Sequence, residues 1–180
     1  MFEFKINLND DDYLFFNQYH FENSPGGRKA LMSFRLVVPC ISFMFICMFI
    51  VLELGLGLIL LEASLLAVLS VFWIVYSKKL ILKSMRNGIK KMKKSGKLPY
   101  SDEALMKFDD EHIYETTSDS ESKREYSSLE KISVTDKAVY IFFSSVQAYI
   151  LPMSVFSDEA QKHKFLEFIS VKAGNLRNAK

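Results

Sequence analysis

The fold is decided by the segment Leu36–Tyr76, which reads LVVPCISFMFICMFIVLELGLGLILLEASLLAVLSVFWIVY. It contains no lysine or arginine and only two acids, Glu53 and Glu62. As one straight helix the segment would be roughly 60 Å long at ~1.5 Å per residue. The hydrocarbon core of a bilayer is only about 30 Å thick. We therefore predict two antiparallel membrane spans, at about residues 33–52 and 58–76.

The turn between the spans is expected at Gly55 and Gly57, because glycine adopts turn conformations that other residues resist. A buried hairpin in a soluble helical protein is the competing interpretation. Neither predicted span carries the polar face of a helix that packs on a soluble core. The membrane hairpin is therefore preferred.

Basic residues flank the predicted spans and are absent between them. Arg28, Lys29 and Arg35 precede the first span, and nine bases without a single acid lie between Lys78 and Lys97. Lys and Arg concentrate on the cytoplasmic side of a membrane. We therefore expect a multi-pass protein of the cell membrane with both termini in the cytoplasm. A signal peptide is not expected, because acids at residues 10–12 replace its apolar run.

A basic amphipathic helix is predicted after the second span, with apolar residues at helical spacing between the lysines. Anionic headgroups of the inner leaflet would attract it by ~1 kcal/mol per base near the surface. Nucleic acid is not expected as a partner, because the bases adjoin a membrane exit and precede an acidic domain. The predicted membrane-surface residues are Lys78, Lys79, Lys83, Arg86, Lys90, Lys91, Lys93 and Lys94.

Beyond Pro99 the pattern changes to short strands separated by turn residues. Residues 99–170 carry fourteen acids against seven bases. An amphipathic helix capped by Ser157–Glu159 is expected to run to about Val171. Its apolar stripe consists of Ala160, Phe165, Phe168 and Ile169. The predicted strands are 104–108, 111–117, 122–127, 129–135, 138–143 and 148–151.

The first residues predict a further strand and helix. Phe2–Leu8 alternates apolar and polar residues, as a half-buried strand does. Asn9 or Asp10 can cap a helix over about residues 11–21. This helix would pack on the soluble domain or lie at the membrane surface, and both interpretations remain open. Asn23–Gly27 is expected to form a loop.

These elements predict an α+β protein, with a two-helix transmembrane hairpin and a small cytoplasmic antiparallel β domain closed by a C-terminal helix. The expected divisions are an N-terminal strand and helix (1–29), the hairpin (30–77), the basic juxtamembrane helix (78–98), the β domain (99–172) and a tail (173–180).

Packing and turn motifs recur through the predicted β domain, at Phe108–Ile113, Ser120–Ser122, Tyr126–Ile132, Val139–Phe142, Ala148–Pro152, Phe156 and Phe165–Ile169. Through these motifs, residues of about 100–170 resemble the YcxB-like family of bacterial membrane proteins. The resemblance implies a C-terminal domain similar to bacterial pleckstrin-homology-like (PH-like) domains, with bent antiparallel strands and one closing helix. Such folds usually have seven strands, and we hypothesise that Phe2–Leu8 supplies the seventh. The family implies no reaction.

No catalytic residue, cofactor site or metal site is expected. The three histidines His20, His112 and His163 lie on separate segments without a nearby cysteine. Cys40 and Cys47 are about 10 Å apart along a helix, too far for a disulfide, and we interpret both as packing residues. Nucleotide-binding loops and nucleophile elbows are absent from the sequence. The acids Asp109, Asp110, Glu111 and Glu115 fit a solvated turn better than a calcium loop.

The expected function is that of a non-enzymatic, membrane-anchored interaction or regulatory module, with a protein partner or self-association in addition to the bilayer. The alternative is an oligomeric transport or sensing protein that uses Glu62 and Glu53. An acid inside a span is a functional candidate by default, but Glu62 lies about one turn into its span, where a carboxylate reaches water. Two spans per chain enclose no pathway, so transport requires self-assembly.

Overall fold

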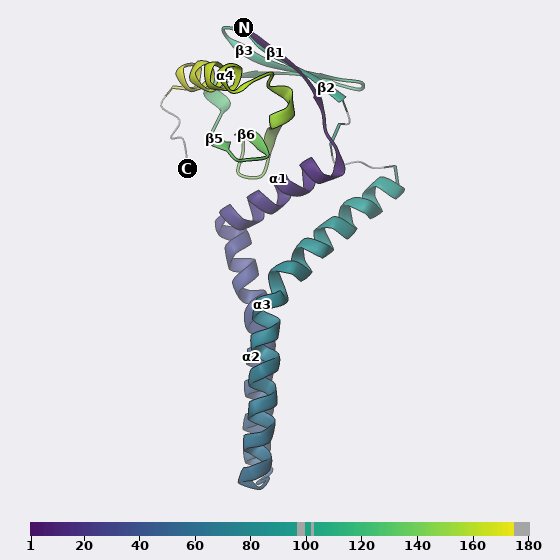
Figure 1. Ribbon diagram of the computed structural model, residues 1–180, viewed down its shortest axis with the longest axis vertical. Helices are drawn as coiled ribbons and strands as arrows, with labels where there is room; N and C mark the ends of the chain where they lie inside the picture. Colours follow the sequence, from purple (N-terminus) through teal and green to yellow (C-terminus); the bar gives the residue numbers. More distant parts are fainter. Residues whose placement is uncertain (97–99, 102, 175–180) are drawn as a thin grey trace. The chain divides into compact units, whose positions relative to one another are not determined.

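The computed structural model describes residues 1–96, 100, 101 and 103–174. The chain divides into two compact units, one of Met1–Asn17 with Ile89–Lys180 and the other of Gln18–Gly88. The first unit contains two antiparallel sheets and a C-terminal helix, and we call it the β domain; the second is a helical hairpin (Figure 1). The predicted α+β fold class is confirmed. The predictions for residues 97–99 and 175–180 lie outside the described residues.

The hairpin consists of α2 (Pro25–Val51) and α3 (Leu56–Lys94), which confirms two helices in the predicted region. Both are long and apolar enough to cross a membrane, and almost nothing of either apolar stretch is buried inside the protein. A core helix of a soluble protein would bury one face instead. Helix α3 continues without interruption from the second predicted span into the basic residues that begin at Lys78. It runs through Asn87 and Gly88 and ends at Lys94.

Helix α2 begins earlier than predicted, and the expected loop over Asn23–Gly27 is wrong. Ser24 is the N-cap, and its Oγ accepts a hydrogen bond from the backbone N–H of Gly27 at 3.0 Å. Pro25 follows at the first helical position, where the missing N–H breaks no helical bond. The cap therefore outweighs the loop tendency of the two glycines.

The turn lies where the sequence predicts it, but for a different reason. Glu53, and neither nearby glycine, adopts the left-handed conformation, with φ of 54°. The N–H of Glu53 donates to the carbonyl of Ile50 (3.1 Å), and that of Leu54 donates to Phe49 (3.2 Å). These two bonds form a Schellman motif, which ends helices at a left-handed residue. Gly57 lies inside α3.

Side chains of α2 and α3 form hydrogen bonds that hold the two helices of the hairpin together. They join Trp73 Nε1 to the Phe34 carbonyl (2.8 Å), Arg35 Nε to Ser77 Oγ (3.2 Å), and the hydroxyls of Ser42 and Ser70 (3.2 Å).

The N-terminal segment forms β1 (Phe2–Asn7) and α1 (Asp10–Asn23). Asn9 is the cap, since its Oδ1 accepts hydrogen bonds from the N–H groups of Asp11 (2.8 Å) and Asp12 (3.0 Å). The sequence left open whether this helix packs on the soluble domain or lies at the membrane surface, and its first half packs on the domain. Phe16 is buried and packs on Tyr140 (5.5 Å between ring centroids) in the β domain.

The first sheet has the order β1-β2-β3-β4 and is antiparallel throughout. Phe4 lies opposite Met106, and Ile6 lies opposite Ala104. The hypothesis that the N-terminal strand joins the strands after the hairpin is therefore confirmed. The other members are β2 (Glu103–Phe108), β3 (His112–Thr117) and β4 (Glu121–Glu125).

The second sheet has the order β5-β6-β7, also antiparallel. A single 3-10 turn at Tyr126–Ser128 separates it from β4, where the sequence predicts a longer strand. Strand β6 lies at the centre of this sheet, between β5 and β7, and all of its residues are buried. The members are β5 (Lys131–Val134), β6 (Ala138–Phe142) and β7 (Ala148–Pro152).

Helix α4 (Glu159–Lys172) closes the core. Phe165 and Ile169 are completely buried, and the Phe165 ring lies 4.9 Å from that of Phe108 and 5.0 Å from that of Phe4. Asp158 caps the helix by accepting from the N–H of Gln161. The predicted apolar stripe holds except at Ala160, which is exposed because it lies in the first turn, before the helix reaches the core.

Candidate functional site: the basic segment and a cavity in the β domain

The eight predicted membrane-surface residues all lie on α3, between Lys78 and Lys94, and we call this stretch the basic segment. At ~3.6 residues per turn, positions 79, 83, 86, 90 and 94 fall on one stripe of a helix. All five side chains are exposed. Ile89, which belongs to the predicted apolar face beside this stripe, is buried, so the predicted amphipathic pattern is confirmed there, although Met92 is exposed.

Lysines of the basic segment form ion pairs with acids on α1. Lys78 forms an ion pair with Glu22 at 3.0 Å, and Lys93 forms one with Asp10 at 3.1 Å. Lys83, Lys90, Lys91 and Lys94 have no carboxylate within ion-pair distance among the described residues. Sequence spacing alone gave no sign of this division, because the acids precede the hairpin.

The two acids of the hairpin lie in different settings. Glu53 shapes the turn through its backbone. Glu62 is half-buried on α3, and the described part of the chain offers it no hydrogen bond or ion pair. No hydrogen bond or ion pair joins Glu53 to Glu62 among the described residues, so a shared role stays a prediction.

The other candidate groups serve the fold. Asp109 accepts hydrogen bonds from the N–H groups of Glu111 (2.8 Å) and His112 (2.6 Å), and these bonds lower its pKa. Asp110 accepts from Lys172 Nζ at 2.9 Å, which lowers its pKa in the same direction. No group of three potential metal ligands occurs among the described residues.

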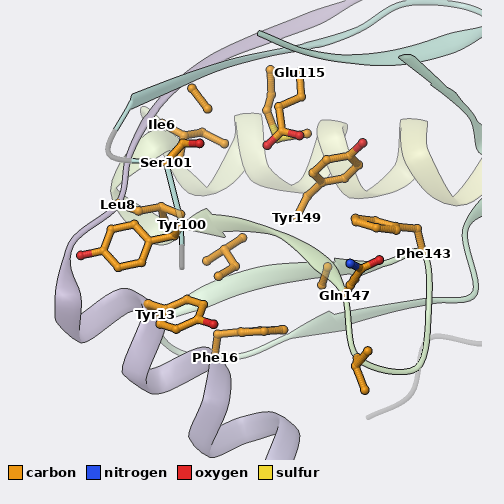
Figure 2. Close-up of a pocket in the computed structure, with 15 residues that line it drawn as sticks. Ile6, Leu8, Tyr13, Phe16, Tyr100, Ser101, Glu115, Phe143, Gln147 and Tyr149 are labelled. Carbon is orange, nitrogen blue, oxygen red and sulfur yellow. The ribbon is translucent and has the colours of Figure 1, made fainter. Parts of the chain in front are cut away.

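Sequence reasoning did not anticipate a cavity of about 400 Å³ in the β domain. Its walls come from strands β1, β2 and β3 of the first sheet, from α1, from residues 100 and 101 before β2, and from the β6–β7 hairpin. The lining residues with chemistry of interest are Tyr13, Phe16, Tyr100, Glu115, Gln147 and Tyr149, and Figure 2 shows them around the space.

The cavity contains polar groups at its inner end. Burial raises the pKa of the Glu115 carboxyl, and the hydroxyl of Ser122, which donates to Glu115 Oε2 at 3.3 Å, acts in the opposite direction. Burial also raises the pKa of the Tyr149 phenol. Tyr149 Oη is buried without a hydrogen-bond partner among the described residues. The alternation of β3 is the one signal that could have placed Glu115 on the inner face.

A protein-family model described as YcxB-like protein matches residues 108–169. These residues are therefore similar to the YcxB-like family. The resemblance inferred from the sequence is thereby confirmed. The match covers about a third of the 180 residues and begins at the last residue of β2. The hairpin, β1 and the wall of the cavity formed by α1 therefore lie outside the matched YcxB-like residues.

Searches of curated proteins and of solved structures returned no match for the chain.

Proposed function

We propose that the protein is a membrane-anchored, non-enzymatic interaction or regulatory module, whose YcxB-like part belongs to a PH-like β domain in the cytoplasm. One observation carries the proposal: strands β1 and β2 pair in one sheet, although the whole apolar hairpin lies between them in the sequence. The anchor is therefore an insertion into the β domain and not an appended tail.

The pairing has a consequence for topology. Both ends of the hairpin lead into one folded unit, so a hairpin that crosses a membrane has both ends on the side of the β domain. The bases that flank the spans, Arg28, Lys29 and the basic segment, assign that side to the cytoplasm. Seven strands closed by one helix support the PH-like assignment.

The basic segment serves as the contact with anionic lipid. Its exposed, unpaired lysines adjoin the second span, and each would gain ~1 kcal/mol near an anionic surface. The acidic excess between residues 99 and 170 makes the β domain itself a poor ligand for the same lipids. The domain is accordingly held near the membrane and left free to bind another partner.

The edge of the first sheet is the surface proposed for a protein partner. Among the described residues, strand β4 has a hydrogen-bonded neighbour on one side only, β3. Its residues Glu121, Lys123 and Glu125 are exposed. An extended peptide adds to such an edge through backbone hydrogen bonds, and the alternating charges on the strand restrict which peptides fit.

The test is site-specific photo-crosslinking in intact membranes. A photoreactive residue replaces Lys123 on β4 or, as the control, Val171 on α4, which is exposed and remote in sequence from the edge. We expect a discrete adduct with another protein from position 123 and none from position 171. Adducts from position 123 that join only copies of this chain would contradict the adaptor function and favour the oligomeric alternative.

A further inference from the structure

The proposed function assigns no role to the cavity of the β domain. Its volume of about 400 Å³ lies within the ~300–1,000 Å³ typical of small-molecule sites. Exposed Ser101, Val146 and Gln147 line its mouth, whereas buried Met106 and Tyr149 lie deeper. The cavity belongs to one compact unit, so its walls are positioned together.

The walls are rich in aromatic rings. Tyr13 and Tyr100 lie 5.2 Å apart, measured between ring centroids, and Phe143 and Tyr149 lie 4.9 Å apart. Figure 2 shows Tyr13 and Phe16, on α1, on the opposite side of the space from Glu115. Aromatic faces carry a negative electrostatic potential and attract cations that come within about 6 Å.

One charge faces this aromatic space. Glu115 is the only residue that carries a charge at neutral pH among the described lining residues. Its sole hydrogen bond is the long one from Ser122, and no Lys or Arg of the described chain lies within ion-pair distance. The positive charge of Arg124 lowers the pKa of Glu115 and opposes the effect of burial, but its guanidinium packs 4.0 Å from the centroid of the Phe143 ring and does not line the cavity.

A second, independent observation points to a missing ligand group. Tyr149 is only 4% exposed, and its hydroxyl has no partner in hydrogen-bond geometry among the described residues, although Ser122 and Arg124 are close enough to lower its pKa against the effect of burial. A buried polar group without a partner is costly and requires an explanation. A bound polar ligand with hydrogen-bonding groups supplies one.

We propose that the cavity binds an organic ammonium ion, with Glu115 as its counter-ion and Tyr13, Phe16 and Tyr149 as its aromatic walls. An anion is disfavoured because the described lining contains no base. A purely apolar ligand would leave the charge of Glu115 without a counter-ion in the cavity and Tyr149 Oη without a hydrogen-bond partner. The ammonium group could come from a free amine or from a lipid headgroup, since both present the same chemistry. This inference does not rest on the proposed membrane anchoring or on a protein partner.

The test uses the full-length protein in uncharged maltoside micelles and isothermal titration with choline. The control ligand is the uncharged isostere of choline, in which carbon replaces the quaternary nitrogen. We expect saturable choline binding at millimolar concentration or below and no binding of the isostere. Equal binding of the two ligands, or no choline binding at all, would overturn the proposal.

Variants assign the binding to the cavity. Glu115→Gln keeps the shape and the bond with Ser122, so we expect choline affinity to fall by about tenfold or more. The matched control Glu121→Gln removes an exposed acid from β4 of the same sheet and should bind as the wild type does. Tyr13→Leu, on the opposite wall, provides a second variant if Glu115→Gln fails to fold. Unchanged affinity in a folded Glu115→Gln or Tyr13→Leu protein would refute the site.

A competition arm distinguishes the two sources of the ammonium group. Displacement of choline by short-chain phosphatidylcholine, but not by phosphatidylglycerol of the same chain length, would identify a lipid headgroup as the ligand. Choline binding that neither lipid displaces would identify a free amine.

Discussion

The carboxylate of Asp10 links two segments that lie far apart in the sequence. It accepts hydrogen bonds from the Tyr100 hydroxyl and from Lys93 Nζ, at 3.1 Å for the lysine. These two interactions, with that of Tyr100 the larger, lower the pKa of Asp10 below its ordinary value. The first residue of α1 is thereby tied to the region that follows the hairpin.

We expect Asp10→Asn to lower the melting temperature of the purified protein at neutral pH. Because folding lowers the pKa of Asp10 from 3.8, its stabilisation is present above that pH and is lost as the pH falls through the folded-state pKa. Circular dichroism melts should therefore show a gap from the wild type at pH near neutral that narrows in acid. Asp119→Asn, an exposed acid in the β3–β4 turn, is the control and should melt like the wild type. A gap of the same size at both pH values would contradict this account of Asp10.

Glu53 offers a second test at the scale of one residue. A left-handed conformation costs a non-glycine residue ~1–2 kcal/mol, while glycine loses ~0.5–1 kcal/mol more backbone entropy on folding. We expect Glu53→Gly to raise the stability of the hairpin by roughly 0.5–1 kcal/mol, measured by thermal unfolding in detergent. Glu53→Gln retains the conformational cost and is the control. Destabilisation by glycine, with glutamine neutral, would show that the turn does not depend on this φ.

Strand β1 is the element whose removal is expected to matter most. Phe4 is 3% exposed, and its ring lies 5.0 Å from that of Phe165 and 5.2 Å from that of Phe156. We expect Phe4→Ala to lower the free energy of unfolding of the β domain by about 3–5 kcal/mol. The neighbouring Lys5→Ala, on the exposed face of the same strand, should change it by about 0.5 kcal/mol or less. If chemical denaturation gave equally small effects for both, β1 would not belong to the folded sheet.

The elements after the hairpin were largely predictable from local signals. Strands β2, β3, β6 and β7 each combine alternating or continuous apolar residues with turn residues at their ends, and their bounds agree with the prediction within one residue. Helix α4 was equally clear, because an acidic cap precedes an apolar stripe. Local sequence patterns suffice to predict an element when packing against the core stabilises the same conformation that those patterns favour.

The remaining features depend on contacts that local patterns do not contain. The start of α2 was missed because Ser24 converts a segment with two glycines into a capped helix. The left-handed residue of the turn is Glu53, although two glycines stand nearby. The cavity was missed because Tyr13, Tyr100, Glu115 and Tyr149 come from four segments that only the folded domain brings together.

At the scale of the whole molecule, the insertion of the hairpin between β1 and β2 unites anchor and domain. Folding of the first sheet requires Phe2–Asn7 to meet Glu103–Phe108, with both spans between them in the sequence. In the proposed topology, the two ends of the hairpin emerge on the same side of the membrane, where these two strands pair. This arrangement is the central claim of the proposed function.

Cysteine labelling of intact cells tests this claim most directly. On a background of Cys40→Ala and Cys47→Ala, Leu54→Cys places a single thiol in the turn, and Asp119→Cys places one in the β3–β4 turn, where the residue is exposed. We predict that a membrane-impermeant maleimide labels position 54 in intact cells and position 119 only after the cells are opened. Labelling of both positions from the same side, or of position 119 in intact cells, would contradict the account.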